Sequence, residues 1–448
     1  MINLKNPLIK GTFILVIIGL INKILGFILR IFLSKCLGAE KLGIYQLIFP
    51  VQGICFALCS AGIQTAISQI TAKFSGNKND IKQKDALRGG IILSMIISIL
   101  CSIMLYSFSN IFSLYILNEK RCDILIKILA VSLPFSSIHS CITGYYYGKE
   151  NAKIPAVSIL LEQIIRVSTT IFLWIYLTKT NKTFEAWHAV AGILSGEVTS
   201  SLYCYISIKK QNFNFTKCSL NTFKLITKTS FPLTCNKVVP GIFQGGEAIL
   251  LPLQLTISGM SMSESLKIYG IITGIALPFI MFPATITNSM SLLLLPTIAK
   301  ADAEKKGYVI FKTSVISLLM SIGLGIFFTL FFFVEGHNIG NMIFKNNSSG
   351  IYLTKMSLVC PFLYANTTMT SILNGLGHVN KTFIYNLISI TIRILMLLLV
   401  VPYYGIIAYI GSILASQAIL FILHLFSLIS IICTFLPASQ SALHHQNS

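Results

Sequence analysis

Residues Gly11–Leu33 read GTFILVIIGLINKILGFILRIFL, an apolar run whose only charged side chains are Lys23 and Arg30. A hydrocarbon core of about 30 Å is crossed by roughly 20 helical residues, so the run is long enough to span a membrane. Similar runs recur along the chain and begin near Gly11, Gly43, Leu87, Ile124, Ile154, Ala186, Phe231, Ile268, Gly307, Thr354, Thr382 and Gly405. Backbone groups in lipid must be hydrogen-bonded internally, so these runs are expected to be helices. With a mean hydropathy of +0.78, the sequence predicts an all-α polytopic membrane protein with about twelve transmembrane helices.

The net charge of +20 does not indicate nucleic-acid binding, because the chain has no soluble module that could carry a basic patch. If the N-terminus is cytoplasmic, the connections on that side hold nineteen lysines and arginines, against ten on the other side. This excess is the positive-inside bias of membrane proteins. We therefore expect both termini to lie in the cytoplasm.

The sequence indicates an internal repeat. EKLGIY, from Glu40 to Tyr45, opens the second run, and ESLKIY, from Glu264 to Tyr269, opens the eighth. Equal numbers of runs in each half favour two six-helix lobes around a central cavity, related by an axis along the membrane normal. An unrepeated helical bundle is the alternative. The expected boundaries are an N-terminal lobe at 1–208, a basic cytoplasmic linker at 209–229, a C-terminal lobe at 230–432 and a polar tail at 433–448.

Charged side chains inside the runs are the candidate functional residues, since each costs about 3 kcal/mol at mid-bilayer unless it finds a partner or water. They are Lys23, Arg30, Glu162, Arg166, Glu197, Lys237, Glu247 and Arg393. Glu162 and Arg166 are four residues apart, so they are expected to neutralise each other on one helix face. Arg393 is the one charged residue in the sequence of its run and lies near the middle of it. Either a structural role or a role in binding a ligand is compatible with this position.

Lys23 and Arg30 are seven residues apart, which places them on nearly the same helix face. No acid lies on their own run to pair with them. They either line a water-filled cavity that attracts anions or pair with an acid of a neighbouring helix such as Glu197. Lys237 lies with Glu247 in the seventh run, where glycines and prolines allow close approach or bending.

No pattern of a soluble enzyme is present. The sequence has no phosphate-binding glycine loop with Lys and Ser/Thr, no zinc-type His/Glu helix and no G-x-S-x-G elbow. The eleven cysteines form no CxxC pair. We expect no enzymatic activity, no metal and no cofactor. Active transport would draw on an ion gradient or the membrane potential, with the coupling ion left open.

Several stretches resemble the stage V sporulation protein B family of polysaccharide-type flippases. The first is KILGFILRIFLSKCLGAEKLGIYQLIFPVQG with SAGIQTAIS, and the second is GYYYGKENAKIPAVSILLEQIIRV, which includes Glu162, Gln163 and Arg166. EAILLPLQL, IYGIITGIALPFIMFPATIT and LLLLPTIAKA resemble the family's seventh and eighth spans. The likeness runs from about residue 11 to residue 430. It implies the fold of the multidrug, oligosaccharidyl-lipid and polysaccharide (MOP) exporter superfamily, in a bacterial cytoplasmic membrane.

The resemblance also implies a function, namely translocation of an undecaprenyl-pyrophosphate-linked glycan by alternating access, with a role in spore cortex or cell-wall synthesis. An anionic headgroup needs cations, and the expected headgroup site is Lys23 and Arg30 with Lys237 or Lys267. Glu162, Arg166, Glu197, Glu247 and Arg393 form the expected intramembrane charge network. The expected partners are a lipid-linked oligosaccharide or another anionic lipid, and membrane lipids, with the chain acting as a monomer. A cation-coupled multidrug antiporter and a non-transporting scaffold for sporulation are the alternatives.

Overall fold

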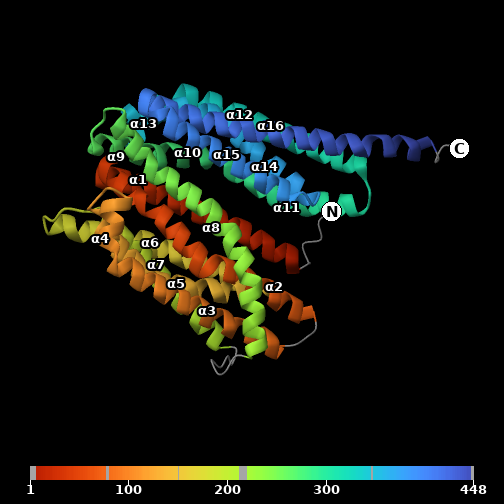
Figure 1. Ribbon diagram of the computed structural model, residues 1–448, viewed down its shortest axis with the longest axis horizontal. Helices are drawn as coiled ribbons and strands as arrows, with labels where there is room; N and C mark the ends of the chain where they lie inside the picture. The colour runs from red at the N-terminus through yellow and green to blue at the C-terminus, as the bar shows by residue number, and fades with distance from the viewer. Residues whose placement is uncertain (1–6, 77–79, 150, 211–218, 345–346, 445–448) are drawn as a thin grey trace. The chain divides into compact units, whose positions relative to one another are not determined.

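The computed structural model describes residues 7–76, 80–149, 151–210, 219–344 and 347–444, which are helical almost throughout (Figure 1). No β-strand occurs in these ranges. The elements are α1 (Pro7–Phe56), η1 (Ala57–Ala61), α2 (Gly62–Gly76), α3 (Asp80–Ser107), α4 (Ser109–Ile111), η2 (Phe112–Ile116), α5 (Cys122–Gly148), α6 (Lys153–Lys179), α7 (Ala186–Lys209), α8 (Leu220–Ile257), α9 (Met262–Ile271), η3 (Ile272–Ala276), α10 (Leu277–Met281), α11 (Ala284–Ala303), α12 (Gly307–Phe344), α13 (Asn347–Met356), η4 (Ser357–Val359), α14 (Cys360–Gly375), α15 (Val379–Leu399) and α16 (Val401–His444). The predicted all-α fold is confirmed.

Nine helical segments of the described chain are long and apolar enough to cross a membrane. The first, Ile17–Phe74, has 58 residues, and such a length suffices for two crossings at about 1.5 Å per residue. The two expected spans outside these nine segments, near Ala186 and Thr354, coincide with α7 and with the stretch from α13 to α14. The multi-pass membrane fold is therefore confirmed, and the helix positions follow the apolar runs of the sequence.

Two glycines break long helices where the sequence places a boundary between spans. Gly38 in α1 has φ 76° and Gly405 in α16 has φ 58°. Positive φ is strained for side chains with a β-carbon, and glycine adopts it without that cost. The Gly38 break thus divides α1 into two spans without a loop, whereas the Gly405 break lies near the start of α16, close to its boundary with α15.

Two compact units divide the chain. The first runs to Ile249 and includes Leu266–Gly270, and the second holds Leu250–Ser265 and continues from Ile271. The expected basic linker at 209–229 lies only partly within the described residues, because 211–218 fall outside them. The internal repeat and the lobe boundaries stay predictions.

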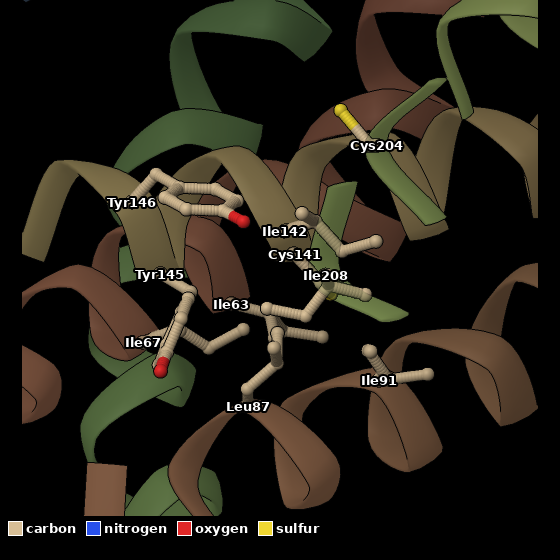
Figure 2. Packing of buried hydrophobic residues seen from close by; sticks show 10 residues of the cluster. All are labelled: Ile63, Ile67, Leu87, Ile91, Cys141, Ile142, Tyr145, Tyr146, Cys204 and Ile208. Atoms are coloured by element: carbon tan, nitrogen blue, oxygen red, sulfur yellow. The ribbon is translucent and has the colours of Figure 1, made fainter. Parts of the chain in front are cut away.

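The core of the first unit joins α2, α3, α5 and α7. Figure 2 shows ten of its buried side chains, among them Ile63, Leu87, Tyr146 and Ile208. The Tyr146 hydroxyl also donates to the carbonyl oxygen of Ser207 at 3.3 Å. Close packing of this kind resists displacement of any one helix. It therefore fixes α5 and α7, which carry two of the site residues described below.

The second unit has its own core, which α11, α12, α14 and α16 build around Ile298, Met369 and Ile372. The Asn366 amide on α14 donates to the carbonyl oxygen of Gln417 on α16 at 2.9 Å. Helix α16 extends to His444 and so covers much of the segment expected as a polar tail.

Candidate functional site: a charged cavity in the first unit

A cavity of about 450 Å³ lies within the first unit among α1, α2, α5, α6 and α7. Its lining includes four residues with charge-bearing groups from three helices: His139 on α5, Glu162 and Arg166 on α6, and Glu197 on α7. Charged groups in a membrane-spanning bundle are costly, and they mark functional sites by default. The cavity is therefore the candidate site of the first unit.

The Arg166 guanidinium binds the Glu162 carboxylate one turn earlier on α6, as the spacing of four residues predicts. The two side chains are only 19% and 17% exposed. A second Arg166 nitrogen donates to the side-chain oxygen of Gln163 at 3.4 Å. The expected ion pair is thus confirmed, and Glu162 does not stand as a lone acid.

His139 brings the second acid into the same cluster. Its Nδ1 atom lies 3.6 Å from Glu197 Oε2 and 3.9 Å from Glu162 Oε2. Ligand-type atoms of the three residues all lie within 4.8 Å of one another. His139 and Glu197 are each only 8% exposed. Three ionisable groups from three helices therefore share one buried position.

Glycines allow the helices to approach closely enough for this cluster. A β-carbon on Gly196 of α7 would lie 2.7 Å from the Glu162 carbonyl oxygen on α6. On α5, a β-carbon on Gly144 would lie 2.5 Å from the Gln64 carbonyl oxygen, and one on Gly148 the same distance from that of Ser68. Small residues four apart permit such contacts between membrane helices. The sequences GILSG at 192–196 and GYYYG at 144–148 carry this pattern.

The predicted headgroup cations of α1 are not among the residues lining this cavity. Lys23 is exposed and Arg30 half-buried, and neither forms an ion pair within the described residues of the first unit. Arg30 and Arg166 both lie within electrostatic range of Tyr45. Among the described residues of this unit Glu197 makes no ion pair with an α1 cation, and its Oε2 atom lies 3.6 Å from His139 Nδ1.

The other two predicted headgroup residues are separate from that cluster. The Lys237 ammonium donates to the Ala61 carbonyl oxygen at 2.6 Å and to the Thr65 hydroxyl at 2.9 Å. Ala61 ends the π-helical turn η1, and such turns often mark functional positions. Lys267 is exposed on α9. A headgroup role for either residue stays a prediction.

The remaining members of the predicted network are not brought into this cavity. Glu247 is buried near the end of α8, and Arg393 is half-buried on α15. Neither residue lines the cavity.

Sequence reasoning missed His139, because only Lys, Arg, Asp and Glu were counted inside the runs. The available signal was a histidine near the middle of the run Cys122–Gly148. Histidine changes charge near neutral pH, so it belongs with the other intramembrane ionisable groups.

Two ion pairs at one end of the first unit stabilise the part of the chain that follows the Gly38 break. Lys41 binds Glu185 at 2.6 Å, and Arg121 binds Glu40 at 2.8 Å. Burial alone would raise the pKa of Glu119, but hydrogen bonds from Arg121 outweigh it, and the pKa lies below its ordinary value. Electrostatic interactions therefore stabilise the chain around the break.

A family model described as polysaccharide biosynthesis protein matches residues 8–302. Stage V sporulation protein B of Bacillus subtilis (strain 168) is 25% identical over 94% of this chain and 83% of its own length. The lipid II flippase MurJ of the same organism is 21% identical over 66% of this chain and 59% of its own length.

Among solved structures, the inward-facing conformation of a multidrug resistance MATE family transporter of the MOP superfamily is similar, with a TM-score of 0.74. The match covers 92% of this chain and 96% of that chain at 13% identity. At this identity the likeness shows the fold alone, and it confirms the predicted MATE-like fold.

Proposed function

This chain belongs to the polysaccharide biosynthesis protein family, and from that premise we propose that it carries a lipid-linked glycan with a pyrophosphate headgroup across the membrane. A flippase is among its relatives, and a multi-pass helical bundle suits the general role of a membrane flippase or exporter. The proposed cargo is an undecaprenyl-pyrophosphate-linked glycan, such as a peptidoglycan precursor or a polysaccharide repeat unit.

The observation that carries this proposal is the positive charge on α1. Lys23 and Arg30 share a helix face and have no ion-pair partner among the described residues of the first unit. A pyrophosphate is bound well by Lys and Arg through charge-assisted hydrogen bonds. Such contacts are strengthened where water is partly excluded. An anionic headgroup is therefore the ligand that these two cations favour.

A cation-coupled multidrug antiporter is the second candidate, because the cavity contains two acids. A cationic drug would need a carboxylate that no protein cation already holds. Glu162 is bound by Arg166, and Glu197 faces His139. Glu162 therefore has a cationic partner, which makes the antiporter the weaker reading. A scaffold that transports nothing is the third candidate, and the experiment below separates all three.

Transport also requires that the headgroup be released on the far side. A ligand held equally in two states shifts no equilibrium between them. We therefore expect the α1 cations to bind the headgroup better in one conformation than in the other. The family fold supplies alternating access, and the cations supply the difference in affinity.

The test reconstitutes the full chain into vesicles that contain undecaprenyl pyrophosphate carrying one N-acetylglucosamine as the probe. The wild type should move the probe between leaflets. Lys23→Ala and Arg30→Ala should each lose most of this activity at normal protein levels, and Lys23→Arg should retain more of it than Lys23→Gln. Lys179→Ala is the matched control, because Lys179 is an exposed lysine at the end of α6.

Three results would overturn the proposal. Wild-type activity in both alanine variants would remove the anionic-headgroup mechanism. A wild type that moves a cationic dye but not the probe would establish the antiporter, and a wild type that moves neither would favour the scaffold.

A further inference from the structure

The cluster of His139, Glu162 and Glu197 has an unequal charge balance. Two carboxylates face one guanidinium, that of Arg166. With a neutral imidazole the cluster carries one excess negative charge in a position that is almost closed to solvent. A buried excess charge is expensive, so it is balanced by one bound positive charge.

The hydrogen bonds around His139 identify that charge. Ser158 Oγ lies 3.1 Å from Nε2 of the ring, and the Ser158 hydroxyl donates its single proton to the Pro155 carbonyl oxygen at 2.8 Å. Ser200 Oγ lies 3.3 Å from Nδ1, and its hydroxyl donates to the Glu197 carbonyl oxygen at 3.1 Å. Each hydroxyl proton has a backbone carbonyl oxygen to donate to, which leaves each serine oxygen available to accept from the ring.

Both ring nitrogens of His139 therefore face acceptors, and this pattern fits an imidazolium with a proton on each nitrogen. The Nδ1 atom also lies 3.6 Å from Glu197 Oε2, which has no hydrogen-bond partner among the described residues. A metal ion would need a lone pair on one ring nitrogen, which the doubly protonated form does not offer.

We propose that His139, Glu162 and Glu197 form a proton-binding site that couples transport to a proton gradient. One proton enters from water, resides on His139 between the two carboxylates and returns to water. No other bond changes. The coupling role rests on the proposed function, whereas the proton site itself rests on the contacts of His139 alone.

The groups that face His139 come mainly from α2, α6 and α7, which pack against α5. They are Glu162 and Arg166 from α6, Glu197 from α7, Gln64 from α2 and Tyr147 from α5 itself, with Tyr45 of α1 near Arg166. Helix α3 contacts α5 through the Gly90 carbonyl oxygen, which accepts from Cys141, and through the Ser102 hydroxyl, which donates to the Ala130 carbonyl oxygen. Among these groups, Arg166 and the two carboxylates are the acid and base side chains beside His139, so they set the balance.

The first experiment observes the proton directly. Full-length protein with 15N-labelled histidine is studied by NMR, and the His139 signal is the one lost in His139→Gln. At neutral pH the wild-type signal should be that of a doubly protonated ring. Glu197→Gln removes a facing charge and should lower the ratio of imidazolium to imidazole roughly tenfold or more. His337→Gln is the control, because His337 is exposed.

A singly protonated His139 in the wild type, or a ratio unchanged by Glu197→Gln, would overturn the proton site. A His139 signal that shifts on adding equimolar ZnCl2 would also overturn it, in favour of a metal site. The wild-type spectrum alone shows whether His139 is doubly protonated. This part of the test therefore does not depend on whether the Glu197→Gln variant folds.

The second experiment tests coupling in the same vesicles and with the same probe as above. A pH gradient of one sign should speed probe movement by the wild type, and His139→Gln should lose that acceleration. An acceleration that persists in His139→Gln would overturn the coupling. If no probe moves in the wild type while the doubly protonated signal is present, the proposed function fails and the proton site stands.

Discussion

Replacing Gly196 by alanine tests whether the contact between α6 and α7 builds the charged cluster. The added β-carbon would lie 2.7 Å from the Glu162 carbonyl oxygen and 3.3 Å from Glu162 Cγ. The helices must separate by about 0.7 Å to reach ordinary contact. Overpacking of this kind costs about 1–3 kcal/mol, and replacing glycine in a helix returns about 0.5–1 kcal/mol. We expect a net loss of about 1–2 kcal/mol.

The assay is thermal unfolding in detergent with a thiol-reactive fluorophore. Cys122, Cys141 and Cys204 are free and buried, so they react only when the first unit opens. Gly323→Ala on α12 is the control, because a β-carbon there meets nothing within 4 Å. Gly196→Ala should melt at a lower temperature than the wild type, and the control should not. Equal melting temperatures for the two variants would refute the close approach of α6 and α7.

Arg166→Leu leaves its carboxylate partner buried and uncompensated, so it should cost about 3–5 kcal/mol in the same melting assay; a loss below about 1 kcal/mol would contradict a buried pair. Glu119 has a pKa lowered in the folded state by hydrogen bonds from Arg121, which outweigh burial. Its contribution to stability is therefore complete above the ordinary glutamate pKa of 4.5 and is lost as the pH falls through the lower folded-state value. Glu119→Gln should destabilise the protein at neutral pH, with the difference shrinking in strong acid, and a constant difference would exclude this linkage. For orientation, a membrane-impermeant thiol reagent added outside cells should label Asn181→Cys but not Asn151→Cys, and reversed labelling would place the termini outside.

The apolar runs predicted the helices well because burial in lipid acts on each segment separately. The pair of Glu162 with Arg166 was predictable for the same reason, since it depends on residues close in sequence. Local geometry fixes which side chains meet on one helix.

The cluster itself could not be predicted, because it depends on the register between helices. His139 and Ser200 are 61 positions apart, and Lys237 reaches a carbonyl oxygen 176 positions away. Register between membrane helices is set by small residues such as Gly144 and Gly196, whose partners are not evident from one sequence. The glycine spacing indicated close packing, but it did not indicate which helix was the neighbour.

The contact between α1 and α6 relates the two proposals to each other. A β-carbon on Gly26 would lie 3.5 Å from the Gln163 side-chain nitrogen, and Gln163 accepts from Arg166. Arg30 lies one turn beyond Gly26, about 6 Å along the helix axis. A proton on His139 adds positive charge to this neighbourhood, so it should strengthen binding of an anionic headgroup at Arg30. Linkage requires the reverse as well, namely that headgroup binding favours proton uptake. Weaker binding of the probe at lower pH would therefore mean that the headgroup binds away from α1, even if both sites exist.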